Sequence, residues 1–140
     1  MRRRTWLLAA ASLAACRRRP PSADALLPAV LAGKWRRRDL RDLPAESAPA
    51  EAARGTVRRI YEAFYEGPTS VQVDLFELVS ATAGLDLAQR WRPAAAAVFF
   101  YKDNYFAVVK WQSFDRGNLT AFVRALEQHL GSFGAGRAAQ

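Results

Sequence analysis

Cysteine and histidine, the side chains most often used for nucleophilic catalysis and metal binding, each occur once in this 140-residue chain, as Cys16 and His129. One cysteine excludes a disulfide framework and any multi-cysteine metal site, and one histidine excludes a histidine cluster. His129 falls in the last turn of a predicted helix, where the helix dipole stabilises an imidazolium, so we assign it a structural role. The sequence has no glycine-rich phosphate loop and no zinc-ligand spacing. We therefore predict no metal and no cofactor.

The residues before Cys16 have the layout of a secretory signal. Arginines at positions 2–4 form a basic start, and residues 6–15 form an uncharged, mostly apolar run that ends in small side chains. That run is about half the ~20 residues needed to span a bilayer, so a permanent transmembrane helix is disfavoured. The alternative interpretation is a buried apolar helix that happens to contain a cysteine.

Leu13-Ala14-Ala15-Cys16 resembles the lipobox of bacterial lipoproteins. The resemblance implies a signal peptide over residues 1–15, cleavage between Ala15 and Cys16, and diacylglycerol, typically palmitate-bearing, on the Cys16 sulfur. It implies anchoring by lipid at the periplasmic face of a membrane, because two or three acyl chains hold a bilayer firmly whereas one binds marginally. The resemblance also favours the outer membrane over the inner membrane. The residue after the cysteine is Arg17, whereas an aspartate at this position favours retention in the inner membrane.

The sequence does not distinguish the general secretory (Sec) route of export from the twin-arginine route. Residues 3–7 (RRTWL) resemble a twin-arginine export motif, but an ordinary basic start explains them equally well. The three arginines at positions 17–19 oppose translocation, since positive charge after an apolar segment tends to stay inside. Once exported, they would lie against lipid headgroups.

The formal net charge of +8 and the pI near 10.5 suggest a nucleic-acid or membrane partner. Part of this charge is explained by export. The arginines at positions 2–4 would be removed with the signal peptide, and those at positions 17–19 would lie next to the membrane. The remaining basic stretch, residues 34–41, surrounds Trp35 and could line a nucleic-acid groove. An exported protein does not meet nucleic acid, so we expect no nucleic-acid binding. The alternative, a cytoplasmic nucleic-acid-binding protein, requires that residues 1–15 are not a signal peptide.

Hydrophobic periodicity predicts an α+β domain in which helices pack on an antiparallel sheet of 4–5 strands. The expected order is strand-strand-helix-strand-strand-helix, with a possible extra strand at Trp35. Helix competes with strand over the first of these elements, because Ile60 and Phe64 are four residues apart. The predicted elements are strands at 57–66 and 69–76, a helix at 79–91, a hairpin at 96–111, and a helix that Asn118 caps and Gly131 ends.

The hairpin is the clearest of these elements. A two-residue loop at Asp103-Asn104 places Tyr101 opposite Phe106 and Phe99 opposite Val108. Both faces of the hairpin are apolar, so we expect it to be central in the sheet and covered on both sides, or covered on one side by a partner.

The chain divides into a signal peptide, a tether and one domain. We predict the lipidated cysteine and tether at 16–33, the α+β domain at 34–131 with a regular core from about residue 54, and a flexible tail at 132–140. The domain resembles a family of uncharacterised bacterial envelope-protein domains, which implies a fold and a location but no activity. The resemblance is carried by Leu27-Pro28, Trp35, Tyr65-Glu66-Gly67, Val71-Gln72-Val73, residues 85–91, Phe99-Phe100-Tyr101 and Tyr105-Phe106.

Aromatic side chains are the candidate binding surface. Trp91, Tyr101, Tyr105 and Trp111, with neighbouring phenylalanines, either line a small apolar pocket or form the core. We predict a non-enzymatic domain that binds or scaffolds an envelope protein or an apolar ligand.

The alternative function is a small envelope hydrolase that uses aspartate or serine. A pocket with convergent polar groups beside one of the aspartates would favour it, and a closed core would exclude it. Asp74 and Glu77, three residues apart in a strand, should point to different sides. The candidate side chains are Asp74, Asp86, Asp115, Ser70, Ser80 and Ser113.

Overall fold

The computed structural model describes residues 19–50, 52 and 56–138. The predicted signal peptide, Cys16 and Arg17 lie outside these residues, so lipidation stays a prediction. Within the described ranges, no helix is both long enough and apolar enough to cross a membrane.

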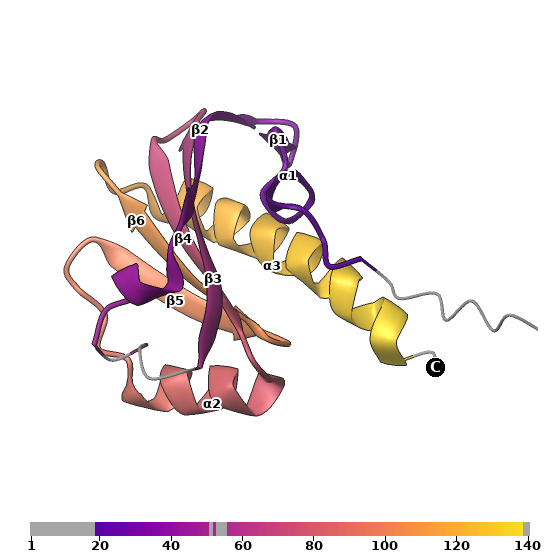
Figure 1. Ribbon diagram of the computed structural model, residues 1–140. Coiled ribbons are helices and arrows are strands. Elements are labelled where there is room, and N and C mark those ends of the chain that lie inside the picture. Colours follow the sequence, from indigo (N-terminus) through magenta and orange to yellow (C-terminus); the bar gives the residue numbers. More distant parts are fainter. Residues whose placement is uncertain (1–18, 51, 53–55, 139–140) are drawn as a thin grey trace, which may run out of the picture.

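The described residues form one curled antiparallel sheet of six strands with three α-helices packed on it (Figure 1). The strands are arranged in the order β1-β2-β3-β4-β6-β5. The elements are α1 (Ala23–Leu26), β1 (Val30–Leu31), β2 (Trp35–Leu43), the 3₁₀ turn η1 (Ala45–Ser47), β3 (Val57–Glu66), β4 (Val71–Leu78), α2 (Ala81–Arg90), β5 (Ala97–Lys102), β6 (Tyr105–Trp111) and α3 (Arg116–Ala138).

The predicted mixed fold with an antiparallel sheet is confirmed, but the predicted strand count and element order are not matched exactly. The sheet has six strands instead of 4–5, because β1 has two residues and is too short for a periodic signal. The strand predicted over residues 57–66 is confirmed, and the helix alternative for this segment is wrong. That segment is β3, which pairs with β2 on one side and β4 on the other.

One face of the sheet packs against α3. Alternate β3 side chains, Tyr61, Ala63 and Tyr65, are buried there in the same cluster as Phe122 of α3. The ring of Phe122 meets Trp35 of β2 edge-on, with ring centroids 5.2 Å apart. Helix α1 docks on the same side, beside the C-terminal half of α3 (Figure 1).

The opposite face is covered only in part, by α2 and by the segment around η1. Ile60, Phe76 and Phe106 of the sheet are buried there with Leu87 of α2. The side chain of Ser80 caps α2 by accepting a hydrogen bond from the Ala83 N–H at 3.1 Å.

Both predicted ends of the last helix are wrong. Asp115 caps α3, since its Oδ1 accepts the Asn118 N–H at 3.1 Å, and Asn118 lies inside the helix. Gly131 does not end α3, which continues to Ala138. A Cβ at Gly131 would lie 2.9 Å from Cε of Lys102, so this glycine lets β5 and α3 approach closely.

The predicted hairpin register is confirmed. Tyr101 lies opposite Phe106 and Phe99 opposite Val108. The prediction of a central position holds for β6, which lies between β4 and β5, and is wrong for β5, which ends the sheet. Val98 and Tyr101 of β5 are accordingly exposed.

Candidate functional site

A groove of about 470 Å³ opens on the sheet face opposite α3. We call it the face groove. Its base consists of side chains from β3, β4 and β6. One wall is formed by Leu43, Ser47 and Pro49 around η1, and the other wall is formed by Trp91 and Arg92 after α2. The volume lies within the ~300–1,000 Å³ typical of small-molecule sites.

Three polar side chains, Glu62, Asp74 and Lys110, line the base of the face groove, and Gln72 lies between the two carboxylates. We call these four residues the polar floor. Glu62 and Asp74 are direct cross-strand partners on β3 and β4, and Lys110 projects from β6. Adjacent antiparallel strands therefore bring together side chains that are distant in sequence.

The polar floor is hydrogen-bonded throughout. Gln72 Nε2 donates to Asp74 Oδ1 at 2.9 Å and to Glu62 Oε2 at 3.2 Å. Lys110 Nζ lies 2.7 Å from Asp74 Oδ2, and Arg41 contributes a longer approach, 3.9 Å, to Glu62 Oε1. Arg41 also pairs with Asp39, at 2.9 Å, and Arg92 lines the groove wall. Three carboxylates are thus balanced by three cations, and the floor offers hydrogen-bonding groups without an excess of charge.

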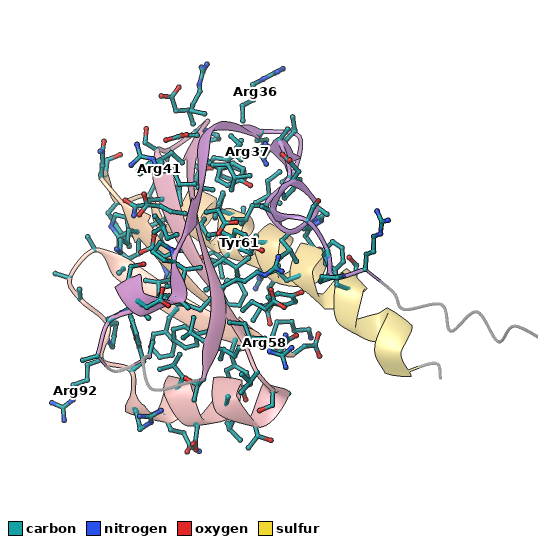
Figure 2. All side chains as sticks on the ribbon, viewed as in Figure 1. Arg36, Arg37, Arg41, Arg58, Tyr61 and Arg92 are labelled. Carbon is teal, nitrogen blue, oxygen red and sulfur yellow. The ribbon has the colours of Figure 1, made fainter. Side chains whose placement is uncertain are left out.

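Trp91 forms the aromatic wall of the face groove. It caps the C-terminus of α2, where its N–H bonds to the Leu87 carbonyl, and Pro93 follows it in the sequence. Its ring contacts Phe106 at 5.2 Å and Phe76 at 6.3 Å between centroids. Next to it, Arg92 extends into solvent (Figure 2).

A second groove, of about 580 Å³, lies between β5 and the N-terminal half of α3. We call it the edge groove. Its apolar lining includes Val98, Trp111 and Phe114, and the Phe114 side chain is 69% exposed. Arg116 and Arg124 of α3 also line it.

The structure does not bring the four predicted aromatic residues into one pocket. Trp91 and Tyr101 lie on the face-groove side of the sheet, whereas Tyr105 and Trp111 lie on the α3 side. Tyr105 is buried in the core and Tyr101 is exposed. Trp91 and Trp111 line the face groove and the edge groove, respectively.

Of the candidate hydrolytic residues, only Asp74 lies in a groove. Ser80 and Asp115 cap helices, and Asp86 is exposed on α2. Ser70 lines a smaller pocket with Gln72, and Ser113 is exposed. The prediction that Asp74 and Glu77 point to different sides is confirmed, since they lie three residues apart on one continuous strand.

His129 has a structural role, but not the predicted one. Because α3 continues to Ala138, His129 is not in the last turn. Its Nε2 lies 2.6 Å from the carbonyl oxygen of Ala25, so this nitrogen carries the proton and donates. Its ring contacts Phe133 edge-on at 5.4 Å. His129 thus attaches α1 to α3. Among the described residues, no group of three or more metal-ligating side chains could hold a metal ion.

Sequence reasoning missed three residues of the polar floor: Glu62, Gln72 and Lys110. A weak signal could have identified two of them, because polar side chains stand next to buried apolar ones in β4 and β6. Gln72 and Asp74 alternate with buried valines along β4, and Lys110 interrupts the apolar run of β6. No family model, curated protein or solved structure matches this chain.

Proposed function

We propose that the protein is a lipid-anchored lipoprotein of the bacterial envelope whose domain binds a small polar ligand in the face groove. The observation that carries the binding function is the polar floor beneath Trp91, on a sheet face that α3 leaves uncovered. The anchor rests on the lipobox resemblance of residues 13–16.

The place where the chain enters the domain is compatible with this arrangement. The first described residues lead into α1. Leu26 of this helix and Leu27 after it are buried in the same cluster as Phe122 of α3. The described chain from residue 19 therefore enters the domain on the α3 side of the sheet (Figure 1). The face groove lies on the opposite side of the sheet. A lipid on Cys16 would leave the groove accessible from the periplasm.

The face groove has convergent polar groups beside Asp74, which is the arrangement expected to favour the hydrolase alternative. The bonding within the polar floor nevertheless favours binding over hydrolysis. The hydrolase alternative requires a base or nucleophile that is available to the substrate. Asp74 has both oxygens engaged, by Gln72 and by Lys110. Ser47, the one serine among the described residues lining this groove, donates its hydroxyl to the Pro44 carbonyl at 2.7 Å.

The groove indicates the chemistry of the ligand. The aromatic wall suits an apolar ring face, and the floor presents carboxylate and ammonium groups that accept and donate hydrogen bonds. Because Lys110, Arg41 and Arg92 offset the charges of Asp74, Glu62 and Asp39, a neutral ligand fits better than an ion. We therefore propose a neutral ring compound with several hydroxyl or amide groups.

The test follows Trp91 directly. The full chain, labelled with 5-fluorotryptophan in mild detergent, is titrated with N-acetylglucosamine as the probe and followed by ¹⁹F NMR. The Trp91 resonance, assigned with Trp91→Phe, should shift, and Trp35 on the other face should not. Asp74→Asn and Lys110→Met should weaken the response at least tenfold, because each removes a group from the floor.

Trp111→Phe is the matched control, because Trp111 lies outside the face groove. It should leave the titration unchanged. The absence of any Trp91 shift, or a shift that the two floor variants do not weaken, would contradict the proposed binding function.

A further inference from the structure

The outer edge of β5 has backbone groups without a hydrogen-bond partner among the residues that the structure describes. The Trp111 N–H donates to the Ala96 carbonyl at 3.1 Å, so these two residues form a hydrogen-bonded pair of the β5–β6 ladder. Since such pairs alternate along an antiparallel ladder, the backbone groups of Ala97, Phe99 and Tyr101 point away from β6. No described strand lies beyond this edge. A row of free N–H and C=O groups is a template for another strand.

The sequence of β5 does little to prevent such pairing. Soluble proteins protect an edge with proline, a bulge or central charges. β5 reads AVFFYK, in which only Lys102 at its end is charged, and its register with β6 has no bulge. The strand therefore presents an open and apolar edge.

The edge groove lies directly beside these groups. Successive side chains of a strand added to β5 would alternate between the two faces of the sheet, so every second one would face α3. There it would meet the apolar lining formed by Val98, Phe114 and Val123. The groove thus supplies apolar contacts for the alternate residues of an extended peptide.

Charge indicates what kind of peptide fits. Arg116 and Arg124 line the groove, and neither forms an ion pair with a residue that the structure describes. The stretch of α3 from 116 to 124 has no acidic side chain. We propose that the β5 edge binds an extended segment of another protein. Its side chains that face α3, at every second position, are apolar beside Val98 and Phe114 and acidic beside Arg116 and Arg124.

Charge also disfavours the other occupants. If two copies paired antiparallel through β5, both α3 helices would lie on the same face of the joined sheet, and the arginines of one copy would face those of the other. Residues 1–18 of the chain itself contain five arginines and no acidic residue. An acidic segment from a different protein is the occupant that complements the groove.

The probes for this surface are two fluorescein-labelled eight-residue peptides with threonine at the odd positions and valine at positions 4 and 6. One carries glutamate and the other lysine at positions 2 and 8, so that the valines and the charged side chains share the face that meets α3. Binding to the full chain in lipid nanodiscs is measured by fluorescence anisotropy. The glutamate peptide should bind at least tenfold more tightly than the lysine peptide, and its affinity should fall as salt rises. Phe99→Pro removes an outward N–H that β6 does not use, and should reduce binding at least tenfold.

The matched charge variants separate the groove from the overall positive charge. Arg116→Gln with Arg124→Gln should weaken binding of the glutamate peptide at least tenfold. Arg36→Gln with Arg58→Gln removes the same charge from exposed residues elsewhere (Figure 2) and should change affinity less than twofold. Circular dichroism confirms that each variant is folded.

Three results would overturn the proposal. The first is equal affinity for the two peptides, or binding of neither. The second is an equal loss of affinity in the two double arginine variants, which would mean that the overall positive charge of the protein attracts the peptide. The third is a dimer in sedimentation that Phe99→Pro dissociates, which would make a second copy the occupant.

Discussion

Lys110 Nζ lies 2.7 Å from Asp74 Oδ2 across the β4–β6 pair, and this ion pair stands on the base of the face groove. The Asp74 side chain is 16% exposed, so its carboxylate depends on protein partners more than a surface carboxylate does. We predict that Lys110→Met lowers the free energy of unfolding by about 1–2 kcal/mol, measured by urea denaturation.

Arg38→Met is the control for this prediction. Its partner Glu66 is 56% exposed, so the change should cost no more than about 0.5 kcal/mol. Equal losses of unfolding free energy in Lys110→Met and Arg38→Met would mean that the burial of Asp74 does not strengthen its ion pair.

The hydrogen bond from His129 to the Ala25 carbonyl should hold α1 in place. His129→Phe keeps the ring beside Phe133 but removes the donor, and it should destabilise the protein by about 1 kcal/mol. Amide exchange at Leu26 and Leu27, whose N–H groups bond within α1, should become faster. Gln128→Ala, at an exposed neighbouring position, should leave both measurements unchanged. If exchange in α1 stays slow in His129→Phe, packing alone fixes this helix.

Gly67 allows two segments to touch. A Cβ there would lie 2.5 Å from the Lys34 carbonyl oxygen and 2.8 Å from Cδ1 of the buried Trp35. Gly67→Ala should therefore destabilise the protein by more than about 2 kcal/mol in thermal or urea unfolding. At Gly117, near the start of α3, the nearest such atom is 3.6 Å away, and Gly117→Ala should be neutral or stabilising by up to about 1 kcal/mol. A neutral Gly67→Ala would refute this account of the close approach.

Tyr65 should make stability fall at alkaline pH. Its hydroxyl donates to the Pro28 carbonyl at 2.8 Å, and burial raises the pKa of the phenol above its ordinary value of about 10. A raised pKa in the folded state stabilises the protein fully below the unfolded-state pKa, and this stabilisation is lost as pH rises above about 10. Tyr65→Phe should cost about 1 kcal/mol at pH 8 through the lost hydrogen bond, and much less at pH 11. Urea unfolding of both proteins at pH 8 and pH 11 measures the difference in unfolding free energy between them. A difference that is the same at the two pH values would contradict the prediction.

Local patterns were sufficient for the parts of the fold that depend on neighbours in the chain. The β5–β6 register followed from Asp103-Asn104 and the apolar runs on either side, because a two-residue loop fixes which residues face each other. The α3 boundaries did not follow in the same way. Gly131 is typical of a helix end, but here it makes room for Lys102, and that contact is tertiary.

The polar floor shows where local patterns stop being sufficient. Asp74 was recognised as a candidate, but its partners come from three strands. Glu62 reaches it through the β3–β4 register, and Lys110 only because β6, which follows α2 in the chain, returns to pair with β4. Long-range strand pairing therefore determines this site, and single-strand periodicity does not encode it.

The lipid anchor is the central claim of this account, and mass spectrometry of the mature protein tests it most directly. Protein purified from bacterial membranes should yield an N-terminal peptide that begins at Cys16 and carries a diacylglyceryl thioether. Cys16→Ser should abolish this modification and release the protein from the membrane after export or leave it unprocessed. An unmodified chain that begins at Met1 and is found in the soluble fraction would contradict the claim.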